Sequence, residues 1–145
     1  MATVAFGRVA ARLARQVEMG LSQVDLSLPQ YRILMFLDEG TTVPSQLANH
    51  LAVSRPTITS VVDGLVGRGL VERHHHHDDR RRIDHALTPA GRQLLEVADR
   101  SVDARLKEIA GHLEEETQVE EALQGLDWWR RALEAFRTAR MGPAS

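Results

Sequence analysis

The chain has 145 residues and a net charge of −2 at pH 7, which is long enough for one domain with a substantial buried core. It contains no cysteine, which excludes a disulfide framework, a thiolate redox sensor and a cysteine-ligated zinc site. No run of about 18 apolar residues occurs, and arginines are scattered through the N-terminal segment, so we expect neither a membrane span nor a signal peptide. These exclusions predict a soluble cytoplasmic protein.

The charges are distributed unevenly along the chain. Residues 54–95 hold seven arginines against five acidic residues, together with five histidines. Residues 96–127 hold ten acidic residues against three basic ones. A basic middle segment attracts a polyanion more strongly than the net charge suggests, because electrostatic steering depends on local charge.

Apolar positions at helical spacing predict two helices before residue 41. The first stripe recurs every four residues from Val9 to Leu21, is extended by Phe6 and Val24, and predicts a helix of about five turns. The second helix is expected to begin at Pro29, directly after Ser27, and to end at Gly40, where glycine easily adopts a left-handed C-cap.

The segment from residue 44 to residue 69 predicts a helix–turn–helix. A short helix is expected from about Pro44 to Leu51, followed by a tight turn at "AVS". Ser54 is a good N-cap for a second helix, and Gly67 and Gly69 end it. The buried side of this second helix follows the i, i+3, i+4, i+7 pattern: Ile58, Val61, Val62 and Leu65.

A β-hairpin is expected directly after the helix–turn–helix. "LVERH" and "RRIDHALT" have the character of two short strands, and "HHHDDR" is typical of the turn between them. Thr88 then caps a long helix that starts "PAGRQLL", and a last helix follows the acidic link "EEETQ". A hairpin placed after a helix–turn–helix is the order of a winged helix, so we expect a mainly α fold with a small β-hairpin wing.

Two neighbouring segments resemble the MarR (multiple antibiotic resistance regulator) family. They are "PSQLANHLAVSRPTITSVVDGLVGRGLVER" and, after it, "DDRRRIDHALTPAGRQLL". The likeness is detailed over the middle third of the chain, and helix order and length extend it over nearly all of it. The departure is "HHHH", where relatives more often have a proline-containing turn.

This resemblance implies one MarR-type domain over residues 1–145, with a winged helix–turn–helix lobe at 29–88 and dimerisation helices at 1–26 and 89–140. It further implies a homodimer that binds double-stranded DNA at a pseudo-palindromic promoter site, usually as a repressor. Each recognition helix would enter a major groove, and each wing would reach an adjacent minor groove. A small anionic or aromatic effector would release the dimer, and no cofactor is implied.

The outward face of the predicted recognition helix carries short hydroxyl side chains. Such side chains allow the backbone to approach DNA closely, and the positive helix N-terminus favours a phosphate. The alternative is an ordinary surface helix with small polar residues. The candidates for DNA contact are Ser54, Arg55, Pro56, Thr57, Thr59 and Ser60.

The predicted wing carries three successive arginines, a residue type suited to a narrow minor groove and to phosphates. By resemblance, Asp79 and Arg81 form the ordered pair at the wing. Asp78 is an alternative partner, and Asp63 is expected to brace another of the three from the recognition helix. The alternative is a solvated charged turn. The candidate DNA contacts here are Asp79, Arg80, Arg81 and Arg82.

The histidine run, His74 to His77, raises the question of a metal site. Zinc sites usually have four ligands, and no convergence with His50, His85 or His112 is evident, so we expect no metal. We interpret the run as a polar wing edge whose histidines gain charge near DNA phosphates as the pH falls. A metal-responsive repressor stays open as an alternative.

The remaining candidates concern an effector and the dimer. Tyr31, Arg32 and Met35, with Arg12 from the first helix, are expected to line an effector pocket in which arginine suits a carboxylate; ordinary packing is the alternative. The apolar stripes of the terminal helices are too extensive for one small lobe, and a two-fold partner would cover them.

Other functional classes receive less support from the sequence. No nucleophile–base pairing, phosphate-binding glycine loop or complete metal signature occurs, so we do not expect an enzyme. A winged-helix module for protein interaction remains an alternative, although the hydroxyl-bearing face flanked by arginine favours DNA.

Overall fold

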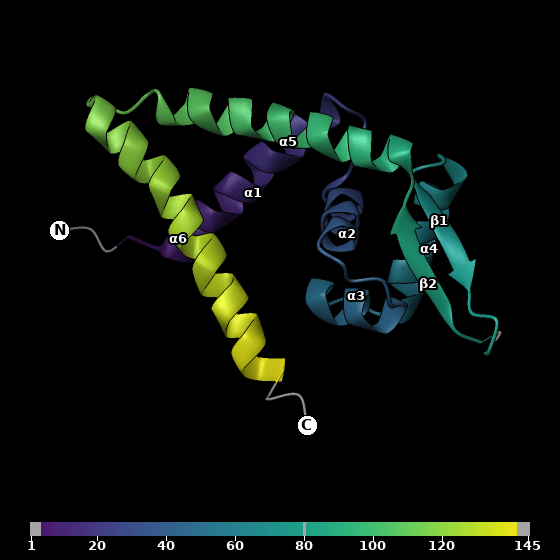
Figure 1. Ribbon diagram of the computed structural model, residues 1–145. Helices are drawn as coiled ribbons and strands as arrows, with labels where there is room; N and C mark the ends of the chain where they lie inside the picture. Colours follow the sequence, from purple (N-terminus) through teal and green to yellow (C-terminus); the bar gives the residue numbers. More distant parts are fainter. Residues whose placement is uncertain (1–3, 80, 142–145) are drawn as a thin grey trace. The chain divides into compact units, whose positions relative to one another are not determined.

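The computed structural model describes residues 4–79 and 81–141 and has the expected order of elements (Figure 1). It is mainly helical with one antiparallel hairpin, which confirms the predicted fold class. The helices are α1 (Phe6–Ser22), α2 (Leu28–Asp38), α3 (Pro44–Leu51), α4 (Arg55–Gly67), α5 (Pro89–Ala110) and α6 (Glu116–Met141), and the strands are β1 (Val71–His75) and β2 (Ile83–Leu87).

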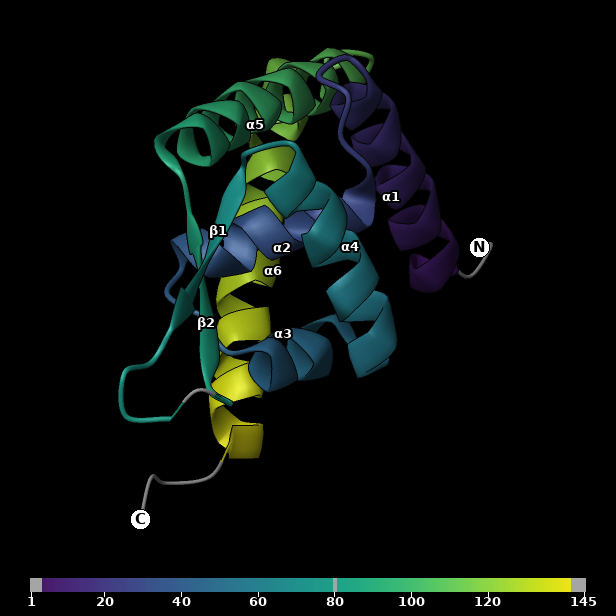
Figure 2. The same cartoon turned by 90° about the vertical axis from the view of Figure 1, so that its right-hand side faces the viewer.

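Contacts divide the chain into two compact units, one ending at Asp103 and the other beginning at Ala104, so that α5 contributes to both. In the first unit, α2 lies against α3, α4 and β2 (Figure 2). The core between them holds the most deeply buried side chains, because the helical stripes and the inward side of the hairpin converge there. These are Leu21, Ile33, Leu34, Leu47, Ile58, Val62, Leu65 and Val71.

Local signals in the sequence account for the ends of α2. Ser27 and Gln30 form a reciprocal capping box: the Gln30 N–H donates to the Ser27 Oγ at 3.3 Å, and the Ser27 N–H donates to the Gln30 Oε1 at 3.0 Å. The helix begins at Leu28, one residue before the predicted Pro29, because Pro29 occupies the second position of the first turn. Gly40 follows the helix with φ +94°, in the left-handed region that favours glycine.

The hairpin is joined closely to α5. Thr88 caps α5 as predicted: its Oγ accepts from the Gly91 N–H at 3.0 Å, and its hydroxyl donates to the Gly69 carbonyl oxygen at 2.6 Å. The Thr88 N–H donates to the Leu70 carbonyl oxygen at 3.1 Å. Gly91 packs on this same carbonyl so tightly that a Cβ atom at Gly91 would lie 2.0 Å from the oxygen. Only glycine fits at this junction.

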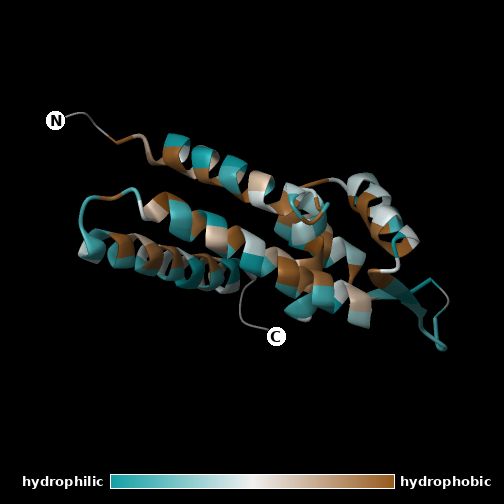
Figure 3. Cartoon of the chain, turned by 90° about the horizontal axis from the view of Figure 1, so that it is seen from above, coloured by the Kyte–Doolittle hydropathy of each residue, from teal (hydrophilic) through white to brown (hydrophobic). Residues whose placement is uncertain are grey.

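The second unit is formed by the end of α5 and by α6. Apolar positions recur along α6 (Figure 3), and several large ones are exposed. None of the helices in residues 4–79 and 81–141 combines the length and the apolar character needed to span a bilayer. The exposed large side chains of α6 are Leu126, Trp128, Trp129, Leu133 and Phe136.

Candidate nucleic-acid interface

Helix α4 has one buried face and one exposed face. Ile58 and Val62 are buried, whereas Arg55 and Thr59 are exposed. The Ser54 Oγ accepts from the Thr57 N–H at 3.3 Å, which confirms the predicted N-cap. Two further hydroxyl contacts stay within the helix: the Ser54 and Thr57 hydroxyls lie 2.8 Å apart, and the Thr59 hydroxyl donates to the Arg55 carbonyl oxygen at 3.0 Å. The remaining outward candidates, Pro56 and Ser60, are also exposed.

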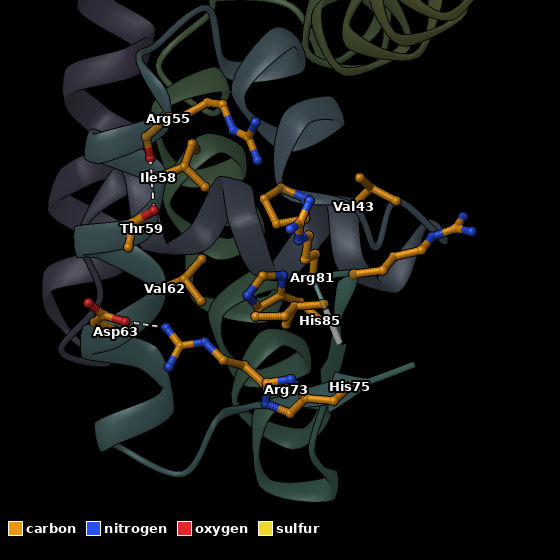
Figure 4. A pocket seen from close by; sticks show the side chains of 13 residues that line it. Val43, Arg55, Ile58, Thr59, Val62, Asp63, Arg73, His75, Arg81 and His85 are labelled. Atoms are coloured by element: carbon orange, nitrogen blue, oxygen red, sulfur yellow. Dashed lines mark hydrogen bonds and ion pairs between the residues drawn. The ribbon is translucent and has the colours of Figure 1, made fainter. Parts of the chain in front are cut away.

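A cleft of about 570 Å³ lies between α4 and the hairpin (Figure 4). Its lining, as far as the structure describes it, combines an apolar wall with four guanidinium groups and one carboxylate. The charge of the cleft is therefore positive. The apolar wall is Val43, Pro44, Ile58, Val62 and Ile83, and the charged residues are Arg55, Asp63, Arg73, Arg81 and Arg82.

The carboxylate in the cleft belongs to Asp63, and its partner differs from the one that the sequence suggested. Asp63 forms an ion pair with Arg73 of β1 (Figure 4), so the expectation that it braces a wing-tip arginine was wrong. The reason is the path of the hairpin: β1 contacts α4, which brings the middle of this strand next to Asp63. Arg73 is a site residue that the motif did not indicate.

The wing tip is shaped by Asp79. Its Oδ1 accepts from the backbone N–H of Arg81 at 3.0 Å, and its carbonyl oxygen accepts from the N–H of Arg82 at 3.0 Å. Asp79 and Arg81 therefore do interact, but through the Arg81 backbone, which leaves the guanidinium to line the cleft. Asp78 is exposed, and Arg80 lies outside the described residues.

The wing histidines have separate partners. The His74 Nε2 lies 3.0 Å from the Glu72 Oε1, and the His76 Nε2 lies 2.8 Å from the Asp84 Oδ2. His75 lines the cleft instead. In the part of the chain that the structure describes, no three histidine, aspartate or glutamate side chains converge on a point that would hold a metal ion.

His85 is a buried member of the cleft that the sequence analysis did not single out. It is only 5% exposed, and its backbone N–H donates to the Thr42 carbonyl oxygen at 3.0 Å. Among the described residues, its Nδ1 has no hydrogen-bond partner. Burial lowers the pKa of the His85 imidazole, and the positive charge of Arg73 lowers it further. Strand alternation was the available signal, because Ile83, His85 and Leu87 share one side of β2.

Of the four candidates for an effector pocket, Tyr31 has a defined polar contact. Its hydroxyl donates to the Asp99 Oδ1 of α5 at 2.5 Å, and burial together with Asp99 raises the pKa of the phenol. Arg32 and Met35 are partly exposed on α2, and Arg12 is exposed on α1. The described contacts do not join these three to Tyr31.

A helix–turn–helix followed by a basic, two-stranded wing defines a winged-helix DNA-binding protein. The family model that matches residues 26–83 is described as MarR family. The regulator FarR of Neisseria gonorrhoeae is 33% identical over 116 residues, which cover 76% of this chain and 80% of FarR. The transcriptional repressor Rv2887 of Mycobacterium tuberculosis is 32% identical over 103 residues, which cover 68% of this chain and 74% of Rv2887.

Solved structures agree with this assignment. The repressor CouR bound to a 23-mer DNA duplex is 27% identical, with a TM-score of 0.69 and coverage of 87% of this chain and 89% of CouR. CouR of Rhodococcus jostii RHA1 bound to p-coumaroyl-CoA has a TM-score of 0.64 at 27% identity, with coverage of 83% and 85%. The chain belongs to the MarR family and is a DNA-binding transcriptional regulator, not an enzyme.

Proposed function

We propose that this regulator is a homodimeric repressor of the bacterial cytoplasm that binds a pseudo-palindromic promoter site. Helix α4 enters the major groove, and the wing follows the adjacent minor groove. The observation that carries the proposal is the basic cleft between these two elements, because it joins the recognition helix and the wing into one positively charged surface. The proposed contacts on α4 are Ser54, Arg55, Pro56, Thr57, Thr59 and Ser60, and those on the wing are Asp79, Arg80, Arg81 and Arg82.

The arrangement of charges supports separate roles for the arginines of α4 and those of the wing. Arg55 lies at the N-terminus of α4, where the helix dipole already favours a phosphate. Arg81 and Arg82 line the cleft from the wing side. Asp79 shapes the turn that presents them, and Asp78 beside it supports the wing. Phosphates seated by these arginines would set the register in which α4 meets the base edges.

A second copy of the chain accounts for the exposed apolar residues of the terminal helices. Phe6 is 78% exposed on α1, and Trp129 and Leu133 are 66% and 63% exposed on α6. Side chains of this size are normally covered, and a two-fold axis would cover both copies at once. It would also place two recognition helices about 34–36 Å apart, as a palindromic site requires.

For the effector, we propose an aromatic molecule that binds near Tyr31, Arg12, Arg32 and Met35. CouR, a relative by structure, is bound to p-coumaroyl-CoA, which carries both an aromatic ring and anionic phosphates, so the choice between the two alternatives rests on this chain's own residues. The Asp99 carboxylate beside Tyr31 disfavours a ligand whose negative charge lies at this point. The aromatic alternative therefore has more support than the purely anionic one.

A mobility-shift titration on the promoter region of the protein's own gene tests the DNA-binding surface. We expect tight binding at about 50 mM salt that weakens steeply by about 200 mM, with a slope of about 0.9 per neutralised phosphate. The Arg81→Ala/Arg82→Ala variant should bind more weakly, with a slope shallower by about 2. Arg100→Ala is the matched control, since Arg100 is an exposed arginine of α5 that does not line the cleft. Equal losses in the two variants would contradict the proposed surface.

A further inference from the structure

We propose that Arg73 is a positioning residue for DNA recognition, and that Asp63, by holding it, makes operator binding specific rather than tight. The proposal rests on the DNA-binding function described above. The Asp63–Arg73 ion pair sets the spacing between the recognition helix and the wing, whereas the neighbouring arginines bind the phosphates.

The position of the pair supports this role. Asp63 lies on α4 one helical turn beyond Thr59, and Arg73 is the middle residue of β1. Their ion pair therefore links the helix that enters the major groove to the strand that leads into the wing. The Arg73 side chain is about one-third exposed, at 32%, and lies along the wall of the cleft instead of extending from it.

The charge balance of the cleft gives Asp63 a further role. Among the described residues that line the cleft it is the one acidic residue, and four arginines line the same cleft. A carboxylate this close to a phosphate-binding surface opposes DNA binding by repulsion. Because Asp63 neutralises Arg73, the charge left for phosphates is that of Arg55, Arg81 and Arg82.

The surroundings of Arg73 leave Asp63 as its anionic partner in the cleft. The residue opposite Arg73 across the hairpin is His85, which is buried and carries no negative charge. Asp84 is next to His85 in sequence, but strand alternation places it on the opposite face of the hairpin from Arg73, where its Oδ2 contacts His76. Without Asp63, Arg73 would be released toward the cleft and would repel the arginines beside it.

This arrangement predicts opposite effects on two kinds of DNA. In an Asp63→Asn variant, the released Arg73 becomes an additional phosphate contact, so random duplex DNA binds more tightly and the salt slope steepens by about 0.9. Operator DNA gains less, because α4 and the wing no longer hold one spacing. The ratio of operator affinity to random-duplex affinity should fall about tenfold or more.

The experiment measures dissociation constants for a promoter fragment and for a random duplex of equal length, each at several salt concentrations. The variants are Asp63→Asn, Arg73→Gln and the double variant, with Asp63→Glu as the conservative replacement. We expect the double variant to weaken operator binding about tenfold without changing the salt slope, because the pair that it removes is neutral and its guanidinium binds no phosphate. Arg73→Gln alone leaves the Asp63 carboxylate unpaired in the cleft, so it should bind both DNAs more weakly than the double variant. Both of these variants should show the same reduced specificity ratio, because both lack the ion pair, and Asp63→Glu should keep most of the wild-type ratio.

The outcomes separate this proposal from the function on which it rests. A salt slope that falls by about 0.9 in the double variant would mean that Arg73 contacts a phosphate directly, and would overturn the positioning role. An unchanged specificity ratio in Asp63→Asn would overturn it as well. In both cases specific binding by the wild type would leave the proposed function standing, whereas a wild type that does not discriminate the promoter fragment would overturn both. Circular dichroism of each variant shows whether the fold is retained.

Discussion

A single methyl group added at Gly91 should destabilise the protein, although alanine normally favours a helix more than glycine does. In a Gly91→Ala variant the new Cβ would lie 2.0 Å from the Leu70 carbonyl oxygen and 2.9 Å from the carbonyl carbon. Carbon–oxygen contacts normally rest at about 3.3 Å, so α5 and the start of the hairpin must separate by more than about 1 Å. Both sides of this contact are backbone, which cannot rotate away as a side chain would.

The size of the effect follows from three contributions. Overpacking of this kind costs about 1–3 kcal/mol, and separation also stretches the Thr88 N–H to Leu70 hydrogen bond, which is worth about 1 kcal/mol. The higher helix propensity of alanine returns about 1 kcal/mol. The free energy of unfolding should therefore fall by about 2 kcal/mol, measured by urea denaturation followed by circular dichroism.

Gly125→Ala in α6 is the matched control, because nothing lies within 4 Å of its added Cβ. At Gly125 only the higher helix propensity of alanine acts, so the free energy of unfolding should rise by roughly 0.5–1 kcal/mol. The two variants must be compared at one protein concentration, since the proposed dimer would make stability concentration-dependent. Equal urea midpoints for Gly91→Ala and Gly125→Ala would refute the reasoning about the junction.

Three further predictions concern other parts of the molecule. Ser54→Ala removes the N-cap of α4 and should lower the free energy of unfolding by about 1 kcal/mol, whereas an unchanged urea midpoint would show that the cap contributes nothing. Burial lowers the pKa of His85, so the contribution of the neutral imidazole to stability is complete above about pH 6.5 and is lost as the pH falls through the lowered pKa. Between pH 7.5 and pH 5.5, the free energy of unfolding should therefore fall less for His85→Val than for the wild type. Parallel pH profiles of the two proteins would contradict this. In the proposed dimer, Leu133→Glu places a charge on the exposed apolar side of α6 and should halve the mass measured by light scattering. A variant that keeps the mass of a dimer would show that the interface lies elsewhere.

Much of the fold could be predicted because its signals are local. The helical stripes need only a period of 3.6 residues, and the caps at Ser27, Ser54 and Thr88 need only a hydroxyl within one turn of the helix start. The left-handed conformation of Gly40 is equally local. The order of these elements, with a hairpin after the helix–turn–helix, was then enough to indicate a winged helix.

The candidate site was predictable only in part. Arg81 and Arg82 were expected on the wing, and they line the cleft. The arginine predicted to pair with Asp63 was the wrong one, because the sequence has several arginines after Asp63 and does not show which of them lies next to it. Only the approach of β1 to α4 selected Arg73 among them.

The sequence by itself determined which segments are helices, which residues cap α2, α4 and α5, and that a basic wing follows the recognition helix, because each of these depends on interactions within a few residues. The tertiary structure decided three further points: that Arg73 belongs to Asp63, that His85 is buried beneath the cleft, and that Gly91 rests on the Leu70 carbonyl. The first joins residues 10 positions apart, the third joins residues 21 positions apart, and the second buries a side chain, so each depends on strand register and on the packing of separate elements. No local pattern contains that information.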